Sequence, residues 1–147
     1  MLTGHIVMPY QSGDIFYRAF KKALIMAKQD HAKITLVKAI HHIEDMGPDM
    51  YVVTSATSNG RDVDEFAKIL PYLQNEAALV KVDFHFEILD MPMSPAESVT
   101  EFALKSQASA IILCKTPQRG LWKKYFTSDI TQDIMNLNPS CDVVLVE

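Results

Sequence analysis

The chain has 147 residues, of which 48% are hydrophobic and 22% charged, and its formal net charge is −4. This length and this ordinary composition predict a single folded domain, 1–147, and exclude a disordered chain. No apolar run is long enough to cross a membrane, and residues 1–10 lack the basic start of a secretory signal, so we expect no membrane partner. Two cysteines are too few for a disulfide framework and indicate thiols in the cytoplasm, and the acidic balance argues against a nucleic-acid partner.

The first part of the chain has the pattern strand, helix, strand. Residues 4–10 form an apolar run that ends in a turn signal, which predicts a buried strand. From Asp14, apolar residues recur at three- and four-residue spacing, which predicts an amphipathic helix to about residue 31 with Asp14 as its N-cap. The apolar run 33–40 predicts a second strand. Residues 44–60 after it are irregular.

The middle of the chain repeats this alternation. A helical pattern resumes at Val63, and Pro71 within it predicts a kink or a break, because proline lacks the backbone N–H of a helix interior. Residues 82–89 alternate polar and apolar side chains, which is typical of a half-buried strand near a sheet edge. Ser94 and Glu97 then form a capping box, which indicates the start of another helix.

The last third completes an α/β pattern. The most continuous apolar run, 109–114, predicts a central strand, and 115–127 reads as a loop. Ile130 and Ile134 indicate a short final helix, and 141–146 closes the chain as a strand. Five strands alternating with helices predict a three-layer sandwich around a five-stranded parallel sheet, for which 3-2-1-4-5 is a common strand order.

This order predicts where a ligand would bind. The first and fourth strands are then neighbours, and ligands of open α/β sheets bind outside the carboxyl ends of strands at such a switch point. The candidate site is therefore loop 9–14 facing loop 114–128. The second loop has no acidic residue and carries Lys115, Arg119, Lys123 and Lys124. It predicts an anion site in which Thr127 and Ser128 hold a phosphate at a helix start, the alternative being a solvated basic loop.

The chain also resembles a known family. HIVMPY before a helix, KITLVKAI, and the segment from SAIILC to CDVVLVE are similar to a universal stress protein domain over nearly the whole chain, most closely over 97–147. The resemblance implies a flavodoxin-like (adenine nucleotide alpha hydrolase-like) sheet of order 3-2-1-4-5, a cytoplasmic location, usually a homodimer and, in one branch, bound nucleotide. Together, the two loops and the resemblance give as candidate ligand-binding residues Pro9, Tyr10, Gln11, Ala39, Cys114, Lys115, Thr116, Arg119, Thr127 and Ser128.

The nucleotide-binding loop of that family is altered in this chain. The family pattern is Gly, two residues, Gly, nine residues, Gly, then Ser or Thr, and counting back from Ser128 puts Thr127, Pro117 and Cys114 at the glycine positions. The acidic residue that contacts the nucleoside in the family falls at Gln11. Added side chains block close approach of the backbone to a triphosphate, and proline removes a donor. The sequence therefore predicts a degenerate loop that does not bind ATP in the classical way.

The apolar last strand, 141–146, indicates a second copy of the chain as partner. An apolar strand at a sheet edge is an aggregation hazard unless it is covered or paired. The resemblance implies that this strand pairs with its copy in a second subunit, the alternative being cover by the chain's own helix or loop. The residues expected at this interface are Val143, Val144, Leu145 and Val146.

These observations favour a homodimeric stress-response binding or regulatory module without classical catalysis. The alternative is a protein that binds ATP, AMP or a cyclic dinucleotide and hydrolyses ATP slowly, with Lys115 or Arg119 as charge partner. A transferase is disfavoured because no general base is evident. No metal is expected, since His41 and His42 would point to opposite faces of a strand. Cys114 is interpreted as a buried structural thiol rather than a reactive one.

Overall fold

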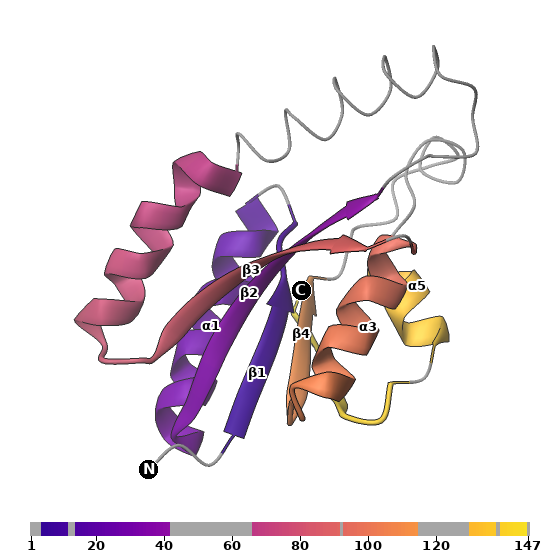
Figure 1. Cartoon of the computed structure of the whole chain (residues 1–147). Helices are drawn as coiled ribbons and strands as arrows, with labels where there is room; N and C mark the ends of the chain where they lie inside the picture. The colour runs from indigo at the N-terminus through magenta and orange to yellow at the C-terminus, as the bar shows by residue number, and fades with distance from the viewer. Residues whose placement is uncertain are drawn as a thin grey trace.

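The structure is a computed structural model that describes residues 4–11, 14–41, 66–91, 93–114, 130–137 and 139–146. Five parallel strands form one sheet of order β3-β2-β1-β4-β5 (Figure 1). The strands are β1 (Gly4–Pro9), β2 (Ala32–His41), β3 (Phe84–Met91), β4 (Ala110–Cys114) and β5 (Asp142–Val146). The helices are α1 (Asp14–Asp30), α3 (Pro95–Lys105), α5 (Ile130–Asn136) and a helix over residues 66–79. The predicted fold class and strand order are confirmed.

Helices cover both faces of the sheet, which gives the molecule three layers (Figure 1). α1 and the helix over residues 66–79 pack on one face, around the buried rings of Phe16 and Phe20. α3 and α5 pack on the other face, where Val99 and Ile134 are fully buried. β1 lies in the middle of the sheet, and all of its residues after the first are buried. Such two-sided burial explains the continuous apolar runs in the sequence.

Two local predictions need correction. Asp14 is the first residue of α1 rather than the cap before it. Its carboxylate lies in the first turn, where its negative charge interacts favourably with the positive end of the helix dipole. Of the two outcomes predicted at Pro71, the break is wrong, because helical residues continue on both sides of it, while the kink stays a prediction. Leu73 and Ala77 are fully buried against the core, and we attribute the continuity to this packing, which offsets one lost backbone bond. The capping box of Ser94 is confirmed: its hydroxyl accepts from the backbone N–H of residue 97 at 3.2 Å.

A buried imidazole ties the start of β1 to its neighbours. The Nδ1 of His5 lies 3.4 Å from the carbonyl oxygen of Ser106, and its Nε2 lies 2.7 Å from the hydroxyl of Thr35. A carbonyl oxygen only accepts, so Nδ1 carries the proton and Nε2 accepts from Thr35. Burial lowers the pKa of His5 below its ordinary value of 6.5, and nearby Lys33 and His85 act in the same direction. His5 is therefore a neutral structural residue at neutral pH.

His5 makes the stability of the fold depend on pH. We expect the free energy of unfolding to fall as the pH drops below 6.5, because the unfolded chain then binds a proton that the folded His5 does not. His5→Gln should flatten this dependence and lower stability at neutral pH by about 1–2 kcal/mol through the altered hydrogen bonds. Urea unfolding followed by circular dichroism between about pH 5 and pH 7 measures both effects. His31→Asn is the control, because His31 is exposed and asparagine accommodates its positive φ. A pH dependence in His5→Gln as steep as that of the wild-type chain would contradict the assignment.

Candidate functional site

The carboxyl ends of β1 and β4 lie side by side, as the strand order predicts. The two strands pair in parallel, with Ile6 opposite Ala110 and Val7 opposite Ile111. Consequently the residues that follow β1 are close to Cys114, the last residue of β4. The start of α5 reaches the same edge, because the hydroxyl of its second residue bonds to the end of β4. This meeting of three segments is the candidate site.

A closed set of three hydrogen bonds holds these segments together. The backbone N–H of Cys114 donates to Oε1 of Gln11 at 3.0 Å. The Nε2 of Gln11 donates to the hydroxyl of Thr131 at 3.2 Å. The hydroxyl of Thr131 in turn donates to the carbonyl oxygen of Cys114 at 2.7 Å. We call this set the Gln11 ring. It joins the loop after β1, the end of β4 and the first turn of α5.

The chemistry of an amide is what closes the ring. The side chain of Gln11 accepts at one atom and donates at the other, and each atom has a partner within the protein. A carboxylate offers acceptors only. With an acidic residue here, the single hydroxyl hydrogen of Thr131 would face two acceptors, the carboxylate and the carbonyl oxygen of Cys114, and one hydrogen bond would be lost. The resemblance places an acidic, nucleoside-contacting residue at this position. In this chain the position joins two elements of the fold and carries no charge.

The other predicted residues within the described part of the chain lie on different faces of the sheet. The ring of Tyr10 packs against Phe16 and Phe66, at centroid distances of 5.1 and 5.5 Å, in the core under α1. The half-buried Ala39 packs against the core under α3. Pro9 is buried at the end of β1. The sheet thus separates Tyr10 from Ala39, and the two do not line one surface.

Cys114 is a structural thiol. It is only 1% exposed, and burial raises the pKa of its thiol to about 11. At neutral pH the group is therefore protonated and a poor nucleophile. Its backbone, rather than its sulfur, contributes to the site through the Gln11 ring. Burial also raises the pKa of the half-buried Cys141.

Several predicted site residues lie outside the described residues. They are Lys115, Thr116, Arg119, Thr127 and Ser128, with Pro117 of the altered glycine pattern. The same holds for His42 of the disfavoured metal pair. Among the residues that the structure describes, no cluster of His, Cys, Asp or Glu could hold a metal ion. In the same part of the chain no helix is long and apolar enough to cross a membrane.

Sequence reasoning missed Thr131. The residue is 5% exposed and shares a helix face with the buried Ile134 three positions later. A hydroxyl on the apolar side of an amphipathic helix was the available signal, because a buried hydroxyl needs a partner. The sequence predicted the functional hydroxyls at Thr127 and Ser128 instead, just before this helix.

Comparison with solved structures identifies the fold. UspA, a universal stress protein from Lactobacillus plantarum, has a TM-score of 0.71 at 15% identity, over 100% of this chain and 99% of that chain. A universal stress protein from Archaeoglobus fulgidus in complex with dAMP has a TM-score of 0.70 at 14% identity, over 100% of both chains. A universal stress protein in complex with cAMP has a TM-score of 0.68 at 15% identity, over 98% and 97%.

Neither a family model nor a curated protein matches the sequence. At such low identities the likeness establishes the fold alone. The expected resemblance is confirmed at that level: the chain folds as the universal stress proteins do. The roles of single residues rest on the geometry of this chain.

The Gln11 ring predicts an unusual response to an almost isosteric substitution. Gln11→Glu should lower the free energy of unfolding by about 1–3 kcal/mol at neutral pH, because a carboxylate cannot donate to Thr131. At acidic pH the protonated carboxyl donates again, so the difference from the wild-type chain should shrink. Chemical denaturation of both chains at neutral and acidic pH measures this difference. Thr131→Ser, which keeps the hydroxyl, is the control, and a Gln11→Glu chain as stable as wild type would contradict the ring.

Proposed function

We propose that this chain, which has the fold of the universal stress proteins, is a homodimeric stress-response binding module that does not bind ATP in the classical way. Its ligand site lies at the carboxyl ends of β1 and β4 and takes an anion. The observation that carries the proposal is the Gln11 ring. It engages both polar atoms of the side chain at the position where the resemblance places a nucleoside contact.

The altered loop supports the same conclusion. Cys114 stands at the first glycine position of the nucleotide-binding pattern, and its side chain is buried at the end of β4. Pro117 and Thr127 stand at the other two positions, where glycine would let the backbone approach phosphates. The loop supplies Lys115 and Arg119 instead, whose charges attract an anion without such a cradle.

A mononucleotide is the second candidate ligand. The fold neighbours named above were solved with cAMP and with dAMP, each of which carries one phosphate. One phosphate needs fewer backbone donors than a triphosphate does, so the loss of loop glycines is less damaging to its binding. This favours AMP or a cyclic nucleotide over ATP, and it leaves slow ATP hydrolysis as the weaker alternative.

The proposed dimer uses the free edge of β5. Within the described residues β5 pairs only with β4, so its other edge has no strand beside it. Leu145 is 36% exposed there, and Val143 and Val144 are half-buried. Antiparallel pairing with a second copy would satisfy the backbone groups of this edge and cover these side chains.

Ligand binding tests the site. Calorimetric titration with ATP, AMP, cAMP and a cyclic dinucleotide should show no submillimolar ATP affinity and should rank a monophosphate above ATP. Submillimolar ATP binding that Ser128→Ala abolishes would contradict the proposal. Ser140→Ala, at an exposed serine next to β5, is the matched control for loss of a hydroxyl.

The oligomeric state in solution tests the proposed dimer interface at the edge of β5. Sedimentation velocity at tens of micromolar should show a dimer for the wild-type chain and a monomer for Leu145→Lys, because a charge at the pairing edge would be buried without a partner. Ile88→Lys is the matched control, since Ile88 is 42% exposed on β3 at the opposite edge. A wild-type monomer, or dissociation of Ile88→Lys alone, would contradict the interface.

A further inference from the structure

The outer surfaces of α1 and of the helix over residues 66–79 form a continuous face. Two contacts join the helices. The rings of Tyr17 and Tyr72 meet edge to face at 6.1 Å between centroids. The Nζ of Lys28 donates to the carbonyl oxygen of Val80 at 3.0 Å. The helices therefore lie side by side, and what each exposes belongs to one surface.

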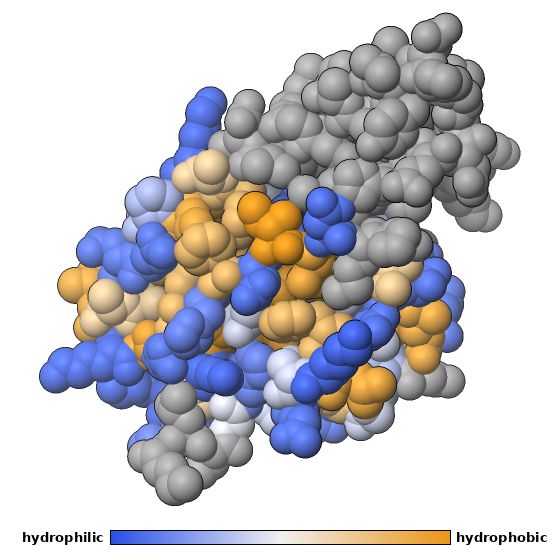
Figure 2. Space-filling view, viewed as in Figure 1, coloured by the Kyte–Doolittle hydropathy of each residue, from blue (hydrophilic) through white to orange (hydrophobic). Residues whose placement is uncertain are grey.

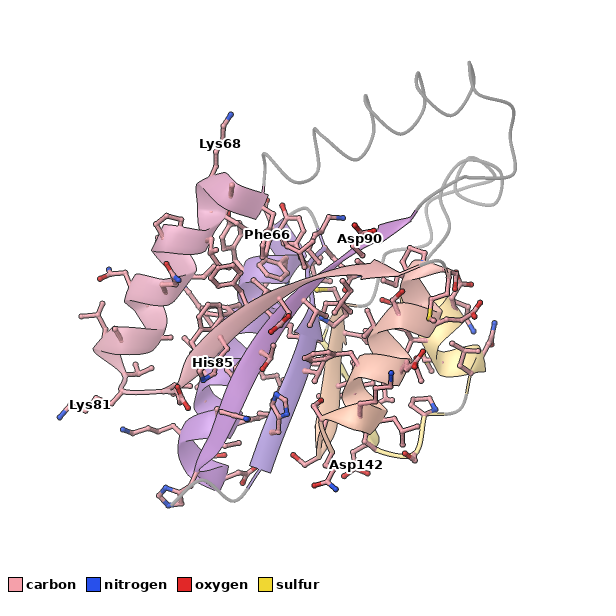
Figure 3. The ribbon with its side chains drawn as sticks, in the orientation of Figure 1. Phe66, Lys68, Lys81, His85, Asp90 and Asp142 are labelled. Carbon is pink, nitrogen blue, oxygen red and sulfur yellow. The ribbon has the colours of Figure 1, made fainter. Side chains whose placement is uncertain are left out.

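Positive charge dominates this surface, which we call the basic face. Its exposed cations are Arg18, Lys21, Lys22, Lys28, Lys68 and Lys81. The cations outnumber the acids of the same segments, which are Asp14 and Asp30 at the two ends of α1 and Glu76, with Asp83 just after Lys81. Figure 3 shows Lys68 near the start of the second helix and Lys81 in the turn after its end, each side chain extending into solvent. On a chain of net charge −4, this concentration of cations is a local feature.

Large apolar side chains stand among these cations. Leu79 is 70% exposed and Tyr72 is 49% exposed on the second helix, and Ile25 is 59% exposed on α1. Figure 2 shows hydrophilic and hydrophobic residues interleaved along the side of the molecule that carries residues 66–79. Exposure of aliphatic groups of this size to water is unfavourable. Tyrosine is enriched at boundaries between an apolar and an aqueous phase.

We propose that the basic face binds the surface of an anionic lipid membrane. The lysines and Arg18 attract lipid phosphates, while Ile25 and Leu79 enter the boundary between headgroups and acyl chains. Nucleic acid also presents phosphates, but its backbone offers little to two protruding aliphatic side chains. The pairing of cations with exposed aliphatics therefore favours lipid. The expectation of no membrane partner rested on the lack of a spanning segment. Attachment through the basic face lies on the membrane surface and needs no such segment.

Vesicle binding by the full chain tests this face. At low salt the protein should sediment with phosphatidylcholine vesicles that contain phosphatidylglycerol and not with phosphatidylcholine alone, and high salt should release it. The double substitution Lys21→Gln and Lys22→Gln should weaken vesicle binding by about tenfold or more, because each cation near the anionic surface adds its own electrostatic attraction. Leu79→Ser keeps the charge and should weaken binding by about threefold or more.

Matched controls distinguish binding through the basic face from nonspecific adsorption to vesicles. Leu104→Ser and Lys105→Gln change an exposed leucine, 64% exposed, and an exposed lysine on α3, which covers the other face of the sheet. Both should leave vesicle binding unchanged. No binding to phosphatidylglycerol vesicles at low salt would overturn the proposal, as would equal losses in Leu104→Ser and Leu79→Ser. Preferential binding of duplex DNA, with vesicle binding insensitive to Leu79→Ser, would also overturn it.

Discussion

The constraint on which this structure depends is the burial of β1 on both faces. Because a central parallel strand is covered on both faces, polar groups near its ends have little access to solvent and form hydrogen bonds within the chain. His5 meets this need at the amino end by bonding to Thr35 and to the backbone of Ser106. Gln11 meets it just beyond the carboxyl end, through the Gln11 ring. Two polar side chains thus connect the middle of the sheet to both of its halves.

Much of the fold follows from local patterns. Parallel strands buried on both sides need continuous apolar runs, so β1 and β4 stand out, and the alternating run at β3 marks an edge strand. The strand ends differ by one or two residues, as for β3, expected at 82–89 and found at Phe84–Met91. Helix boundaries are harder, because tertiary packing overrides propensity, as the unbroken helix at Pro71 illustrates.

The site could be predicted only in part. Topology placed Gln11 beside Cys114, because the carboxyl ends of neighbouring parallel strands share one edge. The role of Thr131 depends on how closely α5 approaches β4, a tertiary fact that no local pattern contains. Tyr10 follows β1 directly, but side chains alternate along a strand, and this one points into the core under α1. The anion-binding role of Lys115 and Arg119 stays a prediction.

The free edge of β5 has a geometrical consequence for the whole assembly. Two copies that pair antiparallel through this edge are related by a two-fold axis perpendicular to the sheet. Rotation about such an axis keeps each helical layer on its own side, so both α1 layers would lie on one side of a sheet shared by two subunits. A flat surface that met one basic face would then meet the second without further diffusion. Edge pairing would make the dimer bivalent, and its attachment would gain from effective concentration without any new contact.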